Sequence, residues 1–366
     1  MARIDLGAVE RNCSALRGRL AGGCELCAVV KADGYGHGAA PCAGAALRGG
    51  ASRLAVATAR EAEEIRLHFP EAKILVMGAL TEQELREVLA ADADVAVWRE
   101  GFRELASRLA GELGAPARVH VKHDSGMGRL GEPDADAVVE LAERCVSDRQ
   151  LELAGVWTHF ATADESDDPF LSEQLAAFAP VADRVRQVQG SVLVHAANSA
   201  ATLHEPASHF DMVRCGVAIY GLDPFGENPD EHRLAPAMEL SSYVADVKSF
   251  EAGMSAGYGR TWRAEAGTWV GVLPIGYGDG VRRGLSNNAE VLVGGRRYPM
   301  VGTISMDNLT IDLGPDPQVQ QGDEAVLIGA QGSERVLAED WASRLETINY
   351  EITCGVSSRI PRVRSA

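Results

Sequence analysis

A glycine-rich turn after an apolar run carries the lysine best placed for chemistry. Residues 27–30 read Cys-Ala-Val-Val, and Lys31 follows them directly at the start of a segment with glycines at 34, 36 and 38. A lysine at the end of a buried strand sits in a partly dry site, and desolvation favours the neutral amine that attacks a carbonyl carbon. The alternative is a lysine whose stem packs beside a turn while its ammonium reaches solvent.

Polar groups also follow two later apolar runs. Lys122 and Arg129 bracket a loop that contains glycines at 126 and 128, and Arg129 could bind a carboxylate or a phenolate. The alternative for this segment is a solvated loop. His159 follows the run that ends at Trp157, where a structural histidine is the alternative to a ligand-binding one.

Two segments near residues 200 and 215 could hold a phosphate group. Ser199 follows one apolar run, and Gly216 follows another that ends at Arg214. In βα barrels the loops after the seventh and eighth strands commonly bind phosphate, and a hydroxyl with backbone N–H groups can do so without net positive charge. A site for pyridoxal phosphate, which acts as an electron sink, needs four such groups at the strand ends. They are a lysine that forms an imine, a phosphate-binding loop, a histidine that can stack on a ring, and an arginine.

The elements that position these groups alternate between two kinds. Short β-branched runs are followed by segments of helical periodicity over the first 220 residues or so, including a capping box formed by Thr81 and Glu84. The count of eight favours an eight-fold βα barrel over a doubly wound open sheet. The predicted strands are Leu26–Val30, Leu54–Ala57, Ile74–Met77, Val95–Val97, Val119–Val121, Leu153–Trp157, Val192–Val194 and Met212–Val213.

A polar, turn-rich connector at residues 223–231 separates the barrel from a different kind of sequence. Helical periodicity disappears beyond it, and Gly294-Gly295 is a hairpin turn signal. We therefore predict a βα barrel over residues 1–228, with the extreme N-terminal strand able to pack with the second domain, and a mostly antiparallel β domain over 229–366. Its predicted strands are Leu240–Val247, Trp269–Ile275, Ala289–Val293, Tyr298–Ile304, Leu309–Leu313 and Ala325–Ile328.

Composition excludes several classes of partner. The formal net charge of −17 argues against binding to nucleic acid or to an anionic membrane. No run of 18 apolar residues is present, we expect no signal peptide from residues 1–5, and the odd count of seven cysteines favours free thiols in a reducing cytoplasm. No cysteine or histidine pair follows the Cys24–Cys27 pair at zinc spacing, so we expect no metal.

Segments spread in order along the whole chain carry a resemblance to a known family. The chain resembles the alanine racemases, pyridoxal phosphate enzymes of fold type III. The matching segments are Ala28–Gly38, Val119–Gly131, Thr158–Asp164, Asn198–Leu203, Arg214–Gly221, Gly257–Trp262, Gly276–Gly280, Gly302–Asp307, Ile348–Glu351 and Arg359–Arg362.

The resemblance implies two catalytic groups. Lys31 would bind the cofactor aldehyde covalently and then act as base or acid on one face of the substrate Cα, while Tyr258 would act on the opposite face. Racemisation needs both, because a proton leaves one face and another returns to the other. In the family this tyrosine comes from the β domain of the other subunit, so the resemblance implies a homodimer with shared active sites.

The resemblance also implies binding roles. His159 would stack on the cofactor ring, Arg214 would hydrogen-bond the ring nitrogen, and Arg129 would contact the phenolate and the substrate carboxylate. The Met306 backbone would receive the same carboxylate. The residues implied to hold the phosphate are Tyr35, Ser199, Gly216, Val217 and Tyr350.

Supporting roles complete the implied site. Lys122 resembles the family's carbamylated lysine, which holds Arg129 in place. Tyr277 would line the entrance, and Asp307 would support the site. An arginine at the ring nitrogen stays protonated, keeps that nitrogen unprotonated and weakens the electron sink. A weak sink suits racemisation better than transamination or decarboxylation.

Four alternatives remain beside alanine racemisation. A barrel-only pyridoxal-phosphate-binding protein would lack Tyr258 and the β domain. A basic-amino-acid decarboxylase would need an acidic group in place of Arg214. A racemase acting on serine, lysine or arginine would share the mechanism, although such enzymes tend to be exported. A structural β protein would leave the groups at the barrel end unexplained. The implied role of the alanine racemase is the supply of D-alanine for peptidoglycan, and a catabolic role is equally compatible.

Overall fold

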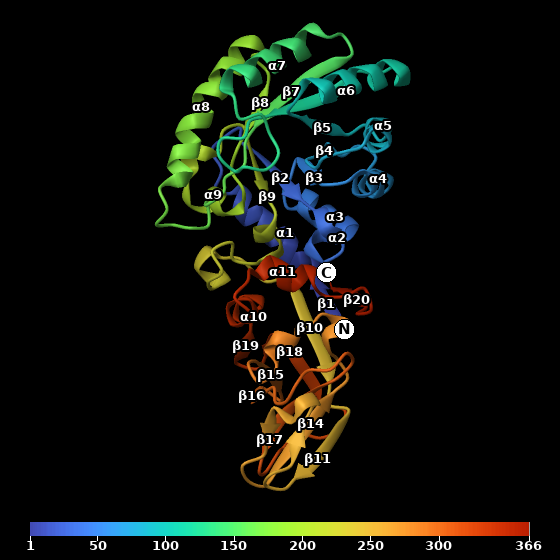
Figure 1. The fold of residues 1–366 in the computed structure, drawn as a ribbon, viewed down its shortest axis with the longest axis vertical. Helices are drawn as coiled ribbons and strands as arrows, with labels where there is room; N and C mark the ends of the chain where they lie inside the picture. Colours follow the sequence, from blue (N-terminus) through green and yellow to red (C-terminus); the bar gives the residue numbers. More distant parts are fainter. Residues whose placement is uncertain (366) are drawn as a thin grey trace. The chain divides into compact units, whose positions relative to one another are not determined.

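The computed structural model describes residues 1–365 and divides into two compact units (Figure 1). One unit comprises Val9–Ile219, and the other combines Met1–Ala8 with the residues from Tyr220 onward. The second unit therefore takes its first strand from the N-terminus, because β1 (Ala2–Asp5) pairs antiparallel with β10 (Met238–Tyr243).

The first unit is the predicted eight-stranded parallel barrel. It closes because β2 pairs with both β3 and β9. Each predicted apolar run overlaps one strand, and the carboxyl ends of all eight strands meet at one rim, as in other barrels of parallel strands. The strands are β2 (Glu25–Val29), β3 (Arg53–Val56), β4 (Ile74–Val76), β5 (Asp94–Val97), β6 (Ala117–Lys122), β7 (Leu151–Trp157), β8 (Leu193–His195) and β9 (Met212–Cys215).

Helices connect the barrel strands and surround them (Figure 1). The predicted capping box is present, because Thr81 and Glu84 bond reciprocally at the start of α5. The helical periodicity reflects buried apolar stripes, as at Val138, Leu141 and Cys145 of α7. The helices are α1 (Leu6–Arg17), α2 (Lys31–Tyr35), α3 (Ala39–Arg48), α4 (Ala59–His68), α5 (Glu82–Ala90), α6 (Glu100–Leu113), α7 (Ala135–Ser147), α8 (Phe170–Val188) and α9 (Ser199–His204).

The second unit is rich in antiparallel strands, as predicted. Its larger sheet has the order β16-β15-β18-β10-β1-β20, in which only β1 and β20 pair in parallel. The predicted hairpin forms, since Val293 pairs with Arg296 around two glycines of positive φ. Its further strands are β11 (Asp246–Phe250), β12 (Ser255–Ala256), β13 (Trp262–Arg263), β14 (Thr268–Leu273), β15 (Glu290–Val293), β16 (Arg296–Pro299), β17 (Leu309–Gly314), β18 (Glu324–Gln331), β19 (Glu334–Val336) and β20 (Arg362–Ser365).

Three expectations for this unit are wrong, the first being the strand Tyr298–Ile304, because β16 ends at Pro299. Helical structure does not disappear beyond the connector, because α10 (Ala338–Arg344) and α11 (Asn349–Cys354) are helices of seven and six residues. Such short helices give too few turns for a periodic signal. The single predicted strand Leu240–Val247 is two strands, β10 and β11, which belong to different sheets.

Cysteines and hydropathy add two observations. The seven cysteines, all within residues 1–365, form no disulfide, and six of them are buried. Among residues 1–365 no helix is both long enough and apolar enough to cross a membrane.

Candidate active site

Lys31 begins a turn with unusual backbone geometry, directly after β2 and Val30. Ala32, Asp33 and Tyr35 are left-handed, with φ of 52°, 51° and 54°. This conformation costs an L-residue roughly 1–2 kcal/mol. The backbone N–H of Ala32 donates to Glu61 Oε1 at 2.7 Å, which helps to hold the turn. Strained backbone of this kind gathers at functional sites, so the turn around Lys31 is a candidate for one.

A buried cup lies between the turns that follow β8 and β9. The Ser199 hydroxyl accepts hydrogen bonds from the backbone N–H groups of Gly216 at 3.0 Å and Ala218 at 3.3 Å. A hydroxyl that accepts two bonds still carries a hydrogen with which to donate. Gly216 leaves room for the phenol of Tyr35, because a Cβ at this position would lie 2.3 Å from Tyr35 Oη. Tyr35, Ser199 and Gly216, three of the residues predicted to hold a phosphate, therefore lie together.

Arg214 is buried beside the strand that leads to Lys31, since Cys27 of β2 pairs with Arg214 of β9. Its Nη2 donates to the carbonyl oxygens of Thr158 at 2.9 Å and Ala196 at 3.0 Å. Its Nη1 donates to His195 Nδ1 at 2.9 Å. Burial lowers the pKa of Arg214 to about 10, which still leaves the guanidinium protonated at neutral pH.

His159 lies close to this guanidinium. Arg214 Nη2 is 3.2 Å from His159 Nδ1. Burial and then the charge of Arg214 hold the pKa of His159 well below its usual range. The imidazole is therefore neutral near pH 7, as a ring that stacks on an aromatic cofactor would be.

Lys122 is a buried lysine among other cations. Its Nζ lies 4.5 Å from the centroid of the Trp157 ring, and the same ring lies 4.8 Å from Arg214 Cζ. Burial first, and then the charges of Arg129 and Arg214, lower the pKa of Lys122 to about 8. A lysine in this environment loses its proton far more readily than one in water.

The loop that carries Arg129 is held by Asp124. The Asp124 carboxylate accepts hydrogen bonds from the backbone N–H groups of Gly126, Gly128 and Arg129, at 3.1, 3.0 and 2.9 Å. Burial alone would raise the pKa of Asp124, but these bonds outweigh it and lower that pKa. The loop keeps its shape while the Arg129 side chain stays exposed.

Tyr258 belongs to the second unit and is open to solvent. It begins a 3₁₀ turn, Tyr258–Arg260, and its side chain is 71% exposed. A cavity of about 360 Å³ beside it is lined in part by Thr303 and Ser305. The phenol is therefore free of the packing that would keep it from reaching a group outside this unit.

Three other predicted residues lie near that segment, and a fourth, Tyr350, lies elsewhere in the same unit. Tyr277 donates its backbone N–H to the Ser305 carbonyl at 3.0 Å, which places it beside Met306. Both side chains are partly exposed, at 44% and 51%. Asp307 accepts a hydrogen bond from Arg359 Nη2 at 2.7 Å. Tyr350 lies on α11, half-buried.

The structure thus gathers the predicted residues into two groups. The group at the carboxyl rim of the barrel comprises Lys31, Tyr35, Lys122, Arg129, His159, Ser199, Arg214, Gly216 and Val217. The group in the second unit comprises Tyr258, Tyr277, Met306, Asp307 and Tyr350. Among residues 1–365 no group of three or more His, Cys, Asp or Glu side chains is placed to hold a metal ion.

Sequence reasoning missed the groups that hold Arg214. His195 of β8 accepts its hydrogen bond, and His120 of β6, two strands away in the barrel, contacts His195. The sequence does carry a sign of this role. His120 stands between Val119 and Val121 in a strand, so its side chain points to the opposite face from the two valines. A polar residue at an inward-facing position of a barrel strand needs a buried partner.

Two models of one protein family match nearly the whole chain. Residues 4–224 match the model of the alanine racemase N-terminal domain, and residues 237–364 match that of the C-terminal domain. A curated relative from Symbiobacterium thermophilum, named alanine racemase, is 42% identical over 362 residues, which cover 99% of this chain and 96% of the relative.

Solved structures agree. The alanine racemase from D-cycloserine-producing Streptomyces lavendulae is 39% identical, with a TM-score of 0.94 over 100% of this chain and 96% of that one. The enzyme from Streptomyces coelicolor A3(2) gives the same identity and TM-score, covering 100% and 97% of the two chains. The chain belongs to the alanine racemase family, a family of isomerases.

Proposed function

We propose that the protein interconverts L-alanine and D-alanine with pyridoxal 5′-phosphate as its cofactor and Lys31 and Tyr258 as its two bases. The observation that carries the proposal is the buried Arg214. It lies on β9, which pairs with β2, the strand that leads to Lys31, and carbonyl and imidazole acceptors hold its guanidinium. The names of the relatives support alanine as the substrate.

The donor set at the barrel rim fits pyridoxal phosphate. Ser199 and the backbone of Gly216 and Val217 would hold the phosphate, together with Tyr35 and Tyr350. The Tyr35 phenol fills the space that a Cβ at Gly216 would need, so its hydroxyl lies beside the Gly216 backbone, where both would contact the phosphate. Lys31 would bind the aldehyde carbon covalently. The cofactor, when bound, would supply an electron sink for the pair left on the substrate Cα.

Three side chains would orient the ring and the substrate. The neutral His159 would stack on the ring, and the protonated Arg214 would donate a hydrogen bond to the ring nitrogen without transferring a proton. Arg129 would contact the phenolate and the substrate carboxylate, which the Met306 backbone would also receive. An arginine in this place limits stray protonation of the cofactor carbon, so it favours racemisation over transamination.

The two bases would work on opposite faces of the substrate Cα. Tyr258 would take the proton from L-alanine while Lys31 returns one to the other face, and the reverse reaction would exchange the roles. We propose that Tyr258 comes from the partner subunit of a homodimer, with Tyr277 and Asp307 beside it at the entrance. The high exposure of Tyr258 in the single chain supports this arrangement.

We also propose that Lys122 carries a carbamate. Its lowered pKa leaves a neutral amine available to react with carbon dioxide. The product would place an anion beside Arg129 and Arg214, where the chain itself provides a cation. A carbamate there would hold Arg129 towards the site.

The family's usual duty suggests that the enzyme supplies D-alanine for peptidoglycan in the cytoplasm. The other candidate, a racemase of serine, lysine or arginine, is not favoured by the relatives, which are named alanine racemase.

A chiral assay of the protein loaded with pyridoxal phosphate against each L-amino acid tests the choice. We expect D-alanine as the main product. A faster reaction with serine, lysine or arginine would favour the alternative, and no racemisation of any amino acid would overturn the proposal.

A further inference from the structure

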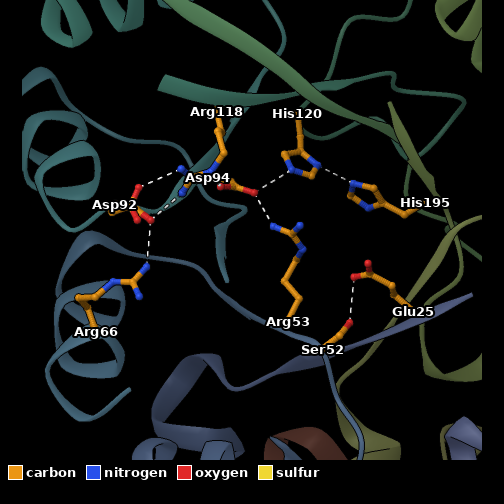
Figure 2. Close-up of polar contacts among 9 residues, drawn as sticks. All are labelled: Glu25, Ser52, Arg53, Arg66, Asp92, Asp94, Arg118, His120 and His195. Atoms are coloured by element: carbon orange, nitrogen blue, oxygen red, sulfur yellow. Dashed lines mark hydrogen bonds and ion pairs between the residues drawn. The ribbon is translucent and has the colours of Figure 1, made fainter. Parts of the chain in front are cut away.

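A chain of hydrogen bonds runs through the barrel interior from Arg214 to the amino-terminal end of β5. His195 Nε2 lies 2.9 Å from His120 Nδ1, and His120 Nε2 lies 3.2 Å from Asp94 Oδ2 (Figure 2). Arg214 bonds to the other nitrogen of His195 at 2.9 Å. All four side chains are buried.

The two ends of this chain fix the direction of every bond in it. A guanidinium can only donate, so His195 Nδ1 accepts and its hydrogen resides on Nε2. His120 Nδ1 must then accept from His195, which places the His120 hydrogen on Nε2. That hydrogen points at Asp94, whose ionised carboxylate can only accept.

Asp94 is held as a carboxylate at the base of the barrel. It is paired with Arg53, and Arg118 Nε donates to its Oδ1 at 2.6 Å (Figure 2). Burial alone would raise the pKa of Asp94, but the bond from His120 and the charges of the two arginines lower it. The acceptor-only state at this end of the chain therefore persists across the neutral pH range.

The two imidazoles between these ends carry no charge near neutral pH. Burial lowers the pKa of His120, although Asp94 opposes the shift. Burial and then the charge of Arg214 hold the pKa of His195 well below its usual range. The positive charge thus stays on Arg214, where it faces neutral acceptors.

The neighbouring strand makes room for His120. Gly155 of β7 lies opposite His120 of β6, next to an irregularity in the pairing of the two strands. A Cβ at Gly155 would lie 2.1 Å from His120 Nδ1. No side chain larger than hydrogen fits at position 155 while His120 stays in contact with His195. The glycine is therefore required for the observed position of the His120 ring.

We propose that Asp94 and His120 are positioning residues for Arg214, because they hold His195 in the only orientation and tautomer that accepts its hydrogen bond. The consequence for the reaction rests on the function proposed above. Without this support, the buried Nε2 hydrogen of His195 loses its acceptor, and its ring gains by turning away. Arg214 would then be held less firmly as a hydrogen-bond donor to the cofactor ring nitrogen.

The tautomers give a first test that requires no activity. ¹⁵N NMR of the full-length protein labelled at histidine, with and without pyridoxal phosphate, reports which ring nitrogen carries the hydrogen. The His120→Phe variant assigns the His120 signal, and His195→Phe assigns the other. We expect both rings to be neutral with the hydrogen on Nε2. A hydrogen on Nδ1 of either ring, or double protonation, would overturn the proposal.

The second test measures reaction fidelity in the loaded enzyme. His120→Phe keeps the volume of the ring and removes the bonds, and we expect at least a tenfold rise, roughly, in transamination events per racemisation. His120→Asn can still accept from His195 and should show a smaller rise. Val121→Ala on the same strand removes buried volume without touching the chain of bonds, so it serves as the control.

Gly155→Ala provides a milder variant, because it displaces the His120 ring without changing its chemistry. We expect it to raise the same ratio and to alter the His120 and His195 signals, while Val121→Ala leaves both unchanged. If His120→Phe and Gly155→Ala bind the cofactor and match Val121→Ala in fidelity, the positioning role is refuted. If the wild-type protein neither binds pyridoxal phosphate nor racemises alanine, the proposed function fails, while the tautomer test still stands.

Discussion

The phenol of Tyr35 occupies the space beside Gly216 that a β-carbon would need. A Cβ at Gly216 would lie 2.3 Å from Tyr35 Oη. The close approach joins the turn after β2 to the turn after β9 within one unit, and Ser199 completes the wall by bonding to the Gly216 N–H.

Gly216→Ala should therefore weaken cofactor binding. The new methyl group must displace Tyr35 or the backbone, so we expect the dissociation constant for pyridoxal phosphate to rise at least tenfold, roughly, since one lost hydrogen bond to a charged group suffices for this. Equilibrium titration followed by cofactor absorbance measures it. Gly190→Ala is the control, because a Cβ at Gly190 meets nothing within 4 Å. Equal affinity in both variants would remove Gly216 from the proposed cup.

Covalent attachment at Lys31 can be tested among few alternatives. The chain has four lysines, at positions 31, 73, 122 and 248. Borohydride treatment of the loaded protein should fix the cofactor on Lys31 alone, because only this lysine follows a barrel strand in a strained turn. Peptide mapping by mass spectrometry identifies the site. Recovery of the label on Lys122 or another lysine would refute the assignment.

The pKa of Lys122 predicts a pH-dependent modification. A pKa of about 8 leaves about half of the amines neutral at pH 8, where an ordinary lysine is almost fully protonated. Only the neutral amine reacts with carbon dioxide, so carbamate formation should rise between pH 7 and pH 9. With ¹³C-labelled bicarbonate we expect one carbamate resonance that Lys122→Arg removes and Lys73→Arg retains. A resonance that survives Lys122→Arg would place the carbamate elsewhere.

A buried carboxyl in the second unit should make stability depend on pH. Glu339 Oε1 accepts from the Asp223 N–H at 2.9 Å and from Asn349 Nδ2 at 2.8 Å, and burial raises the pKa of Glu339. A carboxyl with a raised pKa binds its proton more tightly in the folded state than in the unfolded state. The free energy of unfolding therefore falls as pH rises above the ordinary carboxyl range.

Glu339→Gln keeps the accepting oxygen and removes the charge. We expect the melting temperature to rise by about 2–4 °C at pH 8, for a gain on the order of 1 kcal/mol, and by less at pH 5. Circular dichroism melts at the two pH values measure this. The exposed Glu265→Gln is the control. If Glu339→Gln raised the melting temperature above that of wild type by less at pH 8 than at pH 5, burial of the Glu339 charge would not be the cause.

The sequence predicts the barrel well because its signals are local. Each strand, such as Val119–Val121, is a short apolar run, and each helix repeats its apolar residues over several turns. The helices α10 and α11 escape because seven and six residues offer no period to detect. The break between β10 and β11 escapes because both halves of Leu240–Val247 have strand-forming residues, and only pairing decides which sheet each joins.

The residues of the candidate site likewise differ in whether local sequence reveals them. Lys31, Ser199 and Gly216 were visible because each follows a predicted strand at one rim. The support of Arg214 was not, because Asp94 of β5 and His120 of β6 act on Arg214 of β9 only through His195 of β8, a contact across the barrel that no local pattern reveals. A polar residue inside a strand is an ambiguous sign until its partner is known.

Isotope exchange in Tyr258→Phe tests the two-base proposal most directly. In deuterium oxide, the loaded variant should exchange the Cα hydrogen of L-alanine roughly 10²–10⁴ times more slowly than wild type, because the phenol that removes it is gone. D-alanine should still exchange and keep its configuration, since Lys31 serves that face, and cofactor content should not change. Exchange of both isomers at near wild-type rates would contradict the proposal that Lys31 and Tyr258 divide the two faces.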